Sequence, residues 1–293
     1  MAIKIALAGN PNCGKTTMFN ALTGANQYVG NWPGVTVEKK EGKCKENKDV
    51  IVTDLPGIYS LSPYTLEEVV SRDYLLKEKP EAIINLVDAT NIERNLYLTT
   101  QLLELGIPVV IALNMADLLE KNKISIDTKA LEKELGCKVV KTSALKGTGI
   151  REVVKEAVTA AKKESIVSGE IKFSKDTEAA VSEMEGQLPS SVLEEQKRWY
   201  AIKLLERDAK VLEQLKLTAS VQNQVEKIAA KLEERLDDDT ESIITNERYE
   251  AITYVVEKCV KKPKEKLSTS DKIDQIVTNR ILGLPIFLGV MYV

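Results

Sequence analysis

The stretch GNPNCGKT, at residues 9–16, decides the fold of this chain. It matches the phosphate-loop pattern G-x-x-x-x-G-K-[ST] and stands between an apolar run at residues 3–8 and a helical pattern at residues 16–22. Glycines let such a loop turn its backbone N–H groups inward onto an anion, and the following helix adds the positive end of its dipole. We expect Lys15 to contact the β- and γ-phosphates of a nucleotide and the hydroxyl of Thr16 to bind Mg²⁺. The nucleotide-binding residues predicted in this loop are Gly9, Asn10, Pro11, Asn12, Cys13, Gly14, Lys15, Thr16 and Thr17.

The first half of the chain alternates short apolar runs with amphipathic stretches. Buried strands are predicted at residues 3–8, 50–53, 82–87, 109–113 and 138–141. Helices are predicted at residues 16–22, 66–76, 96–105, 128–135 and 150–161. This alternation indicates an α/β fold with a mostly parallel sheet flanked by helices, in which ligands bind at the carboxyl ends of the strands.

From about residue 165 the strand patterns fade and helical spacing takes over. Apolar residues recur at helical intervals within residues 191–208, 218–236 and 241–260. We therefore predict an α/β domain at residues 1–164, followed by a smaller all-α domain at residues 165–270. The boundary falls in a stretch that contains Ser and Gly.

The composition excludes several kinds of chemistry. The 293 residues include no histidine, which rules out a Ser-His-Asp triad, a Cys-His pair, a His-ligated zinc and a histidine pH switch. Lys and Arg number 41 against 44 Asp and Glu, so the net charge of −3 gives no chain-wide basic field for nucleic acid. The four cysteines lie far apart with no C-x-x-C pair, which is typical of a reduced, cytosolic setting. Catalysis must depend on backbone, Lys, carboxylate, hydroxyl or a bound ion.

Three further motifs follow the phosphate loop, each directly after a predicted strand. In residues 54–57 (DLPG), a carboxylate can hold a Mg²⁺-bound water and a glycine N–H can sense the γ-phosphate. Residues 114–117 (NMAD) resemble the guanine-reading N-K-x-D motif, whose Asp accepts hydrogen bonds from N1–H and the 2-amino group of guanine. Residues 143–145 (SAL) resemble the motif whose Ala N–H meets guanine O6. In this order the motifs indicate a Ras-like P-loop GTPase. The nucleotide-binding residues predicted in them are Asp54, Leu55, Pro56, Gly57, Asn114, Met115, Asp117, Ser143, Ala144 and Leu145.

Two positions depart from the usual GTPase pattern. Met115 stands where most GTPases have Lys, so packing over the base is kept while a charge is lost, and we expect weak nucleotide binding. Ile58 follows Gly57, where Ras-like enzymes have the glutamine that orients the attacking water. Water attack must be assisted by something other than that side chain.

The sequence around these motifs resembles the bacterial and archaeal FeoB family of ferrous-iron transporters. The resemblance rests on residues 9–17 (GNPNCGKTT), residues 54–59 (DLPGIY) and above all residues 29–38 (VGNWPGVTVE). It continues at residues 198–205 (RWYAIKLL), which are similar to the family's helical domain that slows GDP release. Residues 279–287 (NRILGLPIF) are similar to the start of its first membrane helix. The resemblance implies a GTPase domain and a regulatory helical domain of such a transporter.

The loop that contains Thr36 lies between the first helix and the next strand and is punctuated by Gly and Pro. This position suits a threonine that binds Mg²⁺ and closes over the γ-phosphate. The nucleotide-binding residues predicted in this loop are Gly34, Val35 and Thr36. By resemblance, Asn12 holds K⁺ beside the phosphates, with the backbone carbonyls of Gly30 and Trp32 completing the shell. Asn12 could instead only shape the phosphate loop, and Trp32 could be a packing aromatic.

Two sets of functional residues follow from these readings. The residues predicted to act in catalysis are Asn12, Lys15, Thr36 and Gly57. The residues predicted to bind Mg²⁺ are Thr16, Thr36 and, through water, Asp54.

The last residues, 271–293, are predicted to begin a membrane segment. Residues 281–293 carry no charge and follow basic residues up to Arg280, as expected where a cytoplasmic domain leads into a membrane. A buried terminal helix is the alternative. By resemblance, the chain is the soluble part, at the cytoplasmic face of the inner membrane, of a transporter that uses GTP, Mg²⁺ and K⁺ to regulate or drive Fe²⁺ uptake.

The expected partners are guanine nucleotide and the transporter's own membrane domain. The resemblance also leaves room for small accessory transport proteins and for a homo-oligomer, whereas the net charge gives no reason to expect nucleic acid. Two alternatives stay open. One is a GTP-binding switch that hydrolyses slowly and recruits a partner through its helices, and the other is a soluble GTPase of ribosome or tRNA metabolism.

Overall fold

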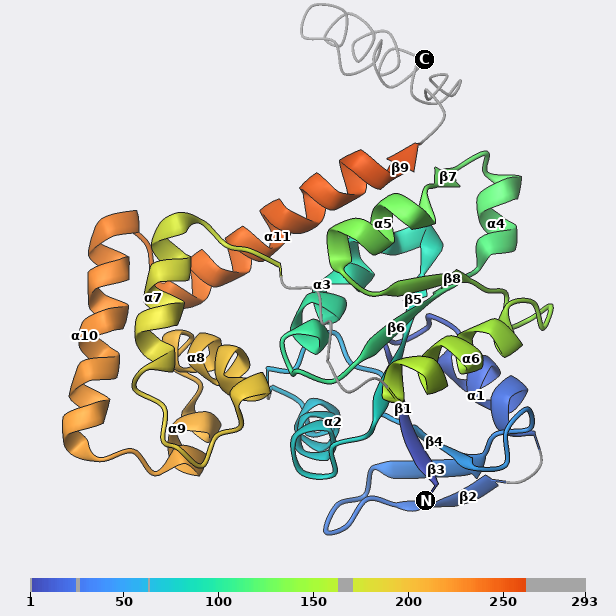
Figure 1. Cartoon of the computed structure of the whole chain (residues 1–293), viewed down its shortest axis with the longest axis horizontal. Coiled ribbons are helices and arrows are strands. Elements are labelled where there is room, and N and C mark those ends of the chain that lie inside the picture. Colours follow the sequence, from blue (N-terminus) through green and yellow to red (C-terminus); the bar gives the residue numbers. More distant parts are fainter. Residues whose placement is uncertain (1, 25–26, 63, 163–170, 262–293) are drawn as a thin grey trace, which may run out of the picture.

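The computed structural model of the chain describes residues 2–24, 27–62, 64–162 and 171–261. These residues form a twisted sheet flanked by helices and, beside it, a group of helices (Figure 1). The predicted domain boundary near residue 164 and the predicted membrane segment at residues 271–293 lie outside the described residues. Within the described ranges, no helix is both long enough and apolar enough to cross a bilayer.

Among the described residues, the sheet has seven strands in the order β2-β3-β4-β1-β5-β6-β8. Its parallel strands are β1 (Ile3–Gly9), β4 (Val50–Asp54), β5 (Ala82–Asp88), β6 (Val109–Asn114) and β8 (Lys138–Lys141). All five were predicted from apolar runs. An antiparallel hairpin of β2 (Gln27–Asn31) and β3 (Glu38–Lys43) extends the sheet beyond β4 and was not predicted. The sequence of β3, EKKEGK, has no apolar residue that would mark it as a strand.

Helices cover both faces of the sheet. On one face, α1 (Lys15–Thr23) and α6 (Ile150–Ala161) pack through residues such as Phe19 and Val153 onto the strands. On the other face lie α2 (Leu66–Lys77), α3 (Ile92–Leu103) and α5 (Thr128–Leu135), while α4 (Ala116–Lys121) follows β6. The α/β fold predicted from the sequence is confirmed.

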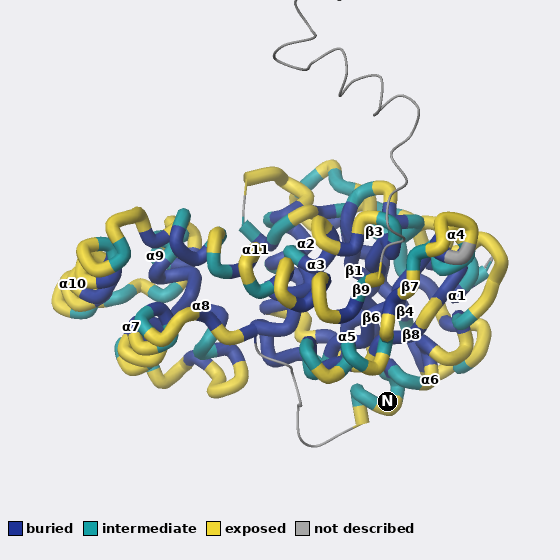
Figure 2. Tube along the Cα trace, turned by 90° about the horizontal axis from the view of Figure 1, so that it is seen from above, coloured by how far each residue is buried: buried dark blue, intermediate teal, exposed yellow. Residues whose placement is uncertain are grey.

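The remaining helices form the second, smaller part of the molecule, as the sequence predicted. They are α7 (Lys175–Glu185), α8 (Lys197–Leu205), α9 (Ala209–Leu215), α10 (Ala219–Leu236) and α11 (Thr240–Cys259). Buried residues of α8, including Trp199 and Leu204, belong to the same apolar cluster as residues of α2 and α3. Buried segments accordingly continue from the sheet into α8, whereas much of α10 is exposed (Figure 2).

The long helix α11 joins the two parts. It begins beside α10, contacts α3 and α5, and ends in a two-residue strand, β9 (Val260–Lys261). This strand pairs with β7 (Ser125–Ile126), which follows α4. Within residues 171–261, the regular structure of the second part is therefore helical except for this short strand, whose pairing partner lies in the first part.

Candidate nucleotide-binding site

The phosphate loop leaves β1 and enters α1 through two residues with left-handed backbone. Asn12 has a φ of 66° and Gly14 a φ of 91°. A Cβ on Gly14 would lie 2.6 Å from Nδ2 of Asn114, and a Cβ on Gly9 would lie 2.7 Å from the carbonyl oxygen of Leu86. Both positions therefore need glycine. The first turn of α1 carries neither a side-chain cap nor an acidic residue, so the positive end of the helix dipole is left for an anion.

Lys15 and Asp54 form an ion pair inside the site. Nζ of Lys15 donates to Oδ1 of Asp54 at 2.6 Å, and both side chains are largely buried. Burial raises the pKa of the Asp54 carboxyl above its usual value, while the Lys15 ammonium acts in the opposite direction. Thr16, one residue further along α1, is exposed. The predicted phosphate-binding and Mg²⁺-binding side chains thus meet at the carboxyl ends of two neighbouring strands.

Asn114 connects three of the predicted motifs. Its Nδ2 donates to the carbonyl oxygen of Cys13 at 2.9 Å, and its Oδ1 accepts a hydrogen bond from N–H of Ala144 at 2.9 Å. Met115 follows with a left-handed φ of 61°, which turns the chain out of β6. One buried side chain therefore holds the phosphate loop, the NMAD segment and the SAL segment together. Sequence reasoning identified Asn114 as part of the base-reading motif but missed this role.

Asp117 lies at the start of α4 with its carboxylate partly exposed. A hydrogen bond from the hydroxyl of Ser143 holds the pKa of Asp117 below its usual value. Nζ of Lys146 lies 3.5 Å from the carboxylate and adds a favourable charge that the sequence analysis did not identify. An ionised carboxylate at this place can accept the paired N–H donors of guanine. Leu145 is exposed beside it.

The loop that contains Thr36 emerges at the same edge of the sheet as the phosphate loop. Lys40 of β3 pairs with Asp54 at the end of β4, so the turn that connects β2 to β3 projects beyond the carboxyl ends of the parallel strands. Thr36 is exposed in this turn, and Gly34 has a left-handed φ of 76°. Whether Thr36 and Val35 contact a nucleotide stays a prediction.

Trp32 is a packing aromatic in this structure. Its indole is buried and lies edge-on to the ring of Tyr74 in α2, with the ring centroids 5.2 Å apart. Nζ of Lys39 lies 5.2 Å from the centroid of the indole. The carbonyl oxygen of Trp32 accepts a hydrogen bond from N–H of Val35 at 3.2 Å. The prediction that this carbonyl and that of Gly30 bind K⁺ remains a prediction.

The loop after β4, residues 54–62, is called the Asp54 loop here. N–H of Ile58 donates to the carbonyl oxygen of Gly9 at 3.3 Å, and a Cβ on Gly57 would lie 3.3 Å from Cα of Pro11. The Asp54 loop therefore packs directly on the phosphate loop. Leu55 and Ile58 are buried, which fits the expectation that Ile58 orients no water.

Cys13 is a passive member of the phosphate loop. It is buried, and burial raises the pKa of its thiol to about 11. A thiol in this state is protonated at neutral pH and is a poor nucleophile.

The fold and the site together define a P-loop nucleotide-binding protein of the G-protein type. Residues 3–157 match the family model "Ferrous iron transport protein B", and residues 173–261 match the model "FeoB cytosolic helical domain". The chain belongs to the FeoB family.

Relatives and solved structures agree with this assignment. The chain is 41% identical over 298 residues to the Fe(2+) transporter FeoB of Shigella flexneri, and 40% identical over 298 residues to that of Escherichia coli K12. In both comparisons the match covers 99% of this chain but 38% of the relative. A GDP-bound mutant of the S. thermophilus FeoB G-domain superposes with a TM-score of 0.86 at 49% identity, covering 88% of this chain and 100% of that one. The mGMPPNP-bound NFeoB from S. thermophilus gives a TM-score of 0.80 at 49% identity, covering 90% and 99%.

Proposed function

We propose that this chain binds guanine nucleotides and hydrolyses GTP to GDP and phosphate. The observation that carries the proposal is the position of Asn114, which holds the phosphate loop against the two segments predicted to read guanine. The nucleotide-bound structures of S. thermophilus FeoB support the same proposal, because they share this fold at 49% identity.

The ion pair of Lys15 and Asp54 suggests how a nucleotide is received. The phosphates of the nucleotide compete with Asp54 for the Lys15 ammonium, which then leaves Asp54 and binds the β- and γ-phosphates. Asp54 loses its partner at the same moment, and its carboxylate would then be free to take part in holding Mg²⁺. Nucleotide binding and completion of the metal site are thereby linked through one carboxylate.

The donor groups at this place fit Mg²⁺. The proposed ligands are the hydroxyls of Thr16 and Thr36 and the carboxylate of Asp54, all hard oxygen ligands of the kind that Mg²⁺ prefers. When bound, the ion neutralises charge that develops on the transferred phosphoryl group. Thr36 would bring the loop between β2 and β3 over the nucleotide, and N–H of Gly57 would meet the γ-phosphate.

A monovalent cation is proposed to assist hydrolysis. The chain has no histidine, and Ile58, which replaces the water-orienting glutamine, is buried. Asn12 is exposed at the turn of the phosphate loop and carries an amide oxygen suited to K⁺, which could supply positive charge at the transition state.

Phosphate release from GTP in KCl and in NaCl at equal ionic strength tests this proposal. We expect a K⁺-specific rise in the hydrolysis rate that Asn12→Ala abolishes, with GDP affinity of the variant measured alongside as a control. Equal slow rates in both salts would remove the cation from the mechanism. They would favour the slowly hydrolysing switch instead.

The family suggests the larger role. The relatives are named Fe(2+) transporters, and the chain spans about 38% of their length. We therefore propose that it forms the domains of such a transporter that lie at the cytoplasmic face of the membrane. Its membrane domain is the proposed partner, and the GTP/GDP cycle regulates or drives uptake of Fe²⁺. In cells that carry the full transporter, Lys15→Ala should abolish uptake of radioactive Fe²⁺ without lowering the amount of protein in the membrane. Uptake that persists at the wild-type rate would contradict this role.

The helical part is proposed to retain GDP. It shares its apolar cluster with α2 and α3, so its removal should loosen the elements that follow the Asp54 loop. Deletion of residues 165–270 should therefore weaken GDP binding, and unchanged GDP affinity would argue against a regulatory role.

A further inference from the structure

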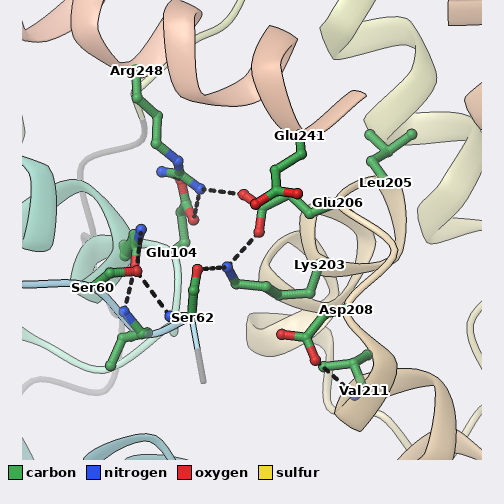
Figure 3. Close-up of polar contacts among 12 residues, drawn as sticks. Ser60, Ser62, Glu104, Lys203, Leu205, Glu206, Asp208, Val211, Glu241 and Arg248 are labelled. Atoms are coloured by element: carbon green, nitrogen blue, oxygen red, sulfur yellow. Dashed lines mark hydrogen bonds and ion pairs between the residues drawn. The ribbon is translucent and has the colours of Figure 1, made fainter. Parts of the chain in front are cut away.

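The Asp54 loop makes polar contacts with the helical part (Figure 3) and also with the phosphate loop. Nζ of Lys203, in α8, donates to Oγ of Ser62 at 3.2 Å. Lys203 is completely buried, and its ammonium also donates to the carboxylate of Glu206. A buried lysine is costly unless it is paired and hydrogen-bonded, so these two acceptors fix where Lys203 can lie.

The pair of Lys203 and Glu206 belongs to a larger buried charge cluster. The other carboxylate oxygen of Glu206 lies 3.9 Å from Nη2 of Arg248, in α11. Arg248 is completely buried and forms a two-pronged contact with Glu104, just after α3, where the distance from Nη2 to Oε2 is 2.8 Å. Two cations and two carboxylates alternate across the boundary between the parts, so their charges balance. Ser62 adds an uncharged acceptor at one end of this row (Figure 3).

Further contacts hold the same end of the Asp54 loop. N–H of Leu61 donates to Oε1 of Gln101, in α3, at 2.6 Å. Two residues beyond the loop, the hydroxyl of Tyr64 donates to Glu241, at the start of α11, at 2.6 Å. The end of the loop that is remote from the phosphates is therefore tied both to α3 and to the helical part.

The other end of the Asp54 loop presents a donor to the phosphate loop. Gly57 lies against Pro11, and N–H of Ile58 donates to the carbonyl oxygen of Gly9. In the part of the chain that the structure describes, no hydrogen bond engages N–H of Gly57. The group that would recognise a γ-phosphate thus lies beside the phosphate loop without a competing partner. A receptor held in place before its ligand arrives saves the cost of ordering it.

We propose that Lys203 is a positioning residue for γ-phosphate recognition. Through its hydrogen bond to Ser62 it holds the Asp54 loop so that N–H of Gly57 can donate to the γ-phosphate of GTP, a group that GDP lacks. The inference rests on the proposed function. GDP lacks the group that N–H of Gly57 would contact, so a restraint on this loop changes the affinity for GTP more than the affinity for GDP. This contact favours the triphosphate, whereas the proposed retention of GDP rests on a different feature, the apolar cluster that the helical part shares with α2 and α3.

The test compares dissociation constants for fluorescent N-methylanthraniloyl derivatives of GMPPNP and GDP, measured with Mg²⁺ present. Ser62→Ala removes the acceptor on the loop and leaves the buried ion pairs intact. We expect it to weaken GMPPNP binding by about fivefold relative to GDP, which corresponds to the net contribution of one ordinary hydrogen bond. Ser62→Thr keeps the hydroxyl and should restore the ratio of the two constants.

Two further variants separate positioning from loss of stability. Lys203→Met should shift the ratio as Ser62→Ala does, and adding Ser62→Ala to Lys203→Met should shift it no further. Arg198→Met breaks an ion pair with Glu178 inside the helical part, so it should lower the melting temperature without changing the ratio.

Each outcome is informative. Three results would overturn the inference. The ratio of the two dissociation constants could stay within twofold of the unmodified chain in Ser62→Ala, it could shift in favour of GMPPNP, or the effects of Ser62→Ala and Lys203→Met could be additive. If the unmodified chain binds neither nucleotide, the proposed function itself fails.

Discussion

Replacing Asn114 with Ala tests whether one side chain of the guanine motif holds the whole site together. Asn114 is 3% exposed, and it makes hydrogen bonds of 2.9 Å with the carbonyl oxygen of Cys13 and with N–H of Ala144. Truncation leaves one acceptor and one donor without a partner, and each such buried group costs about 1–3 kcal/mol. We therefore expect the free energy of unfolding to fall by about 2–6 kcal/mol, even without nucleotide.

The assay is urea unfolding followed by circular dichroism, with Asp117→Ala as the matched control. Asp117 belongs to the same motif, but its carboxylate is partly exposed and its partners are the hydroxyl of Ser143 and the ammonium of Lys146. Its truncation should abolish guanine binding while leaving the urea midpoint nearly unchanged. If Asn114→Ala unfolds at the same urea concentration as the unmodified chain, the reasoning about Asn114 is wrong.

Three further predictions concern separate parts of the molecule. Because burial raises the pKa of Cys13 to about 11, roughly one thiol in a thousand is ionised at pH 8. Alkylation of Cys13 in the folded protein should therefore be slow, and its rate should rise about tenfold per pH unit. Rapid labelling of Cys13 at pH 8 would contradict its burial. Arg248→Met leaves Glu104 buried without its partner, so it should lower the free energy of unfolding in urea by about 3–5 kcal/mol. The double variant with Glu104→Leu should recover much of this loss. An equal loss of unfolding free energy in the single and the double variant would argue against a charge effect. Asp117→Asn exchanges an acceptor for a donor, so titration calorimetry should show weaker GDP binding and stronger binding of xanthosine diphosphate, and an unchanged preference would exclude Asp117 from base recognition.

The core of the nucleotide site could be predicted from the sequence because its motifs are local. The phosphate loop, the residue pattern around Asp54 and the NMAD segment each follow an apolar run, and a strand ends at each of them in the structure. Four predicted strands were one residue too short at their ends. Their last residues are Gly9, Asp54, Asp88 and Asn114, which are small or polar, so the apolar run stops before the strand does.

Contacts between distant segments could not be predicted. The hairpin of β2 and β3 lies at the edge of the sheet. Its strand β3 has no apolar residue, and the adjacent apolar residues of β2, Tyr28 and Val29, are exposed, so neither strand shows the alternation that marks a half-buried antiparallel strand. Nothing in the sequence marks Lys203 and Arg248 as buried, because it does not reveal that Glu206 neutralises the first and that Glu104, across the domain boundary, neutralises the second. The position of Asn114 between two loops likewise depends on the order of the strands.

The central claim, that the chain hydrolyses guanine nucleotide at its phosphate loop, is tested most directly by phosphate release from GTP and from ATP at equal concentration, with Lys15→Met alongside. The account predicts release from GTP, little from ATP, and neither in the variant, because Lys15 is the cation that the phosphates must engage. Equal release from both nucleotides, or undiminished release by Lys15→Met, would contradict it.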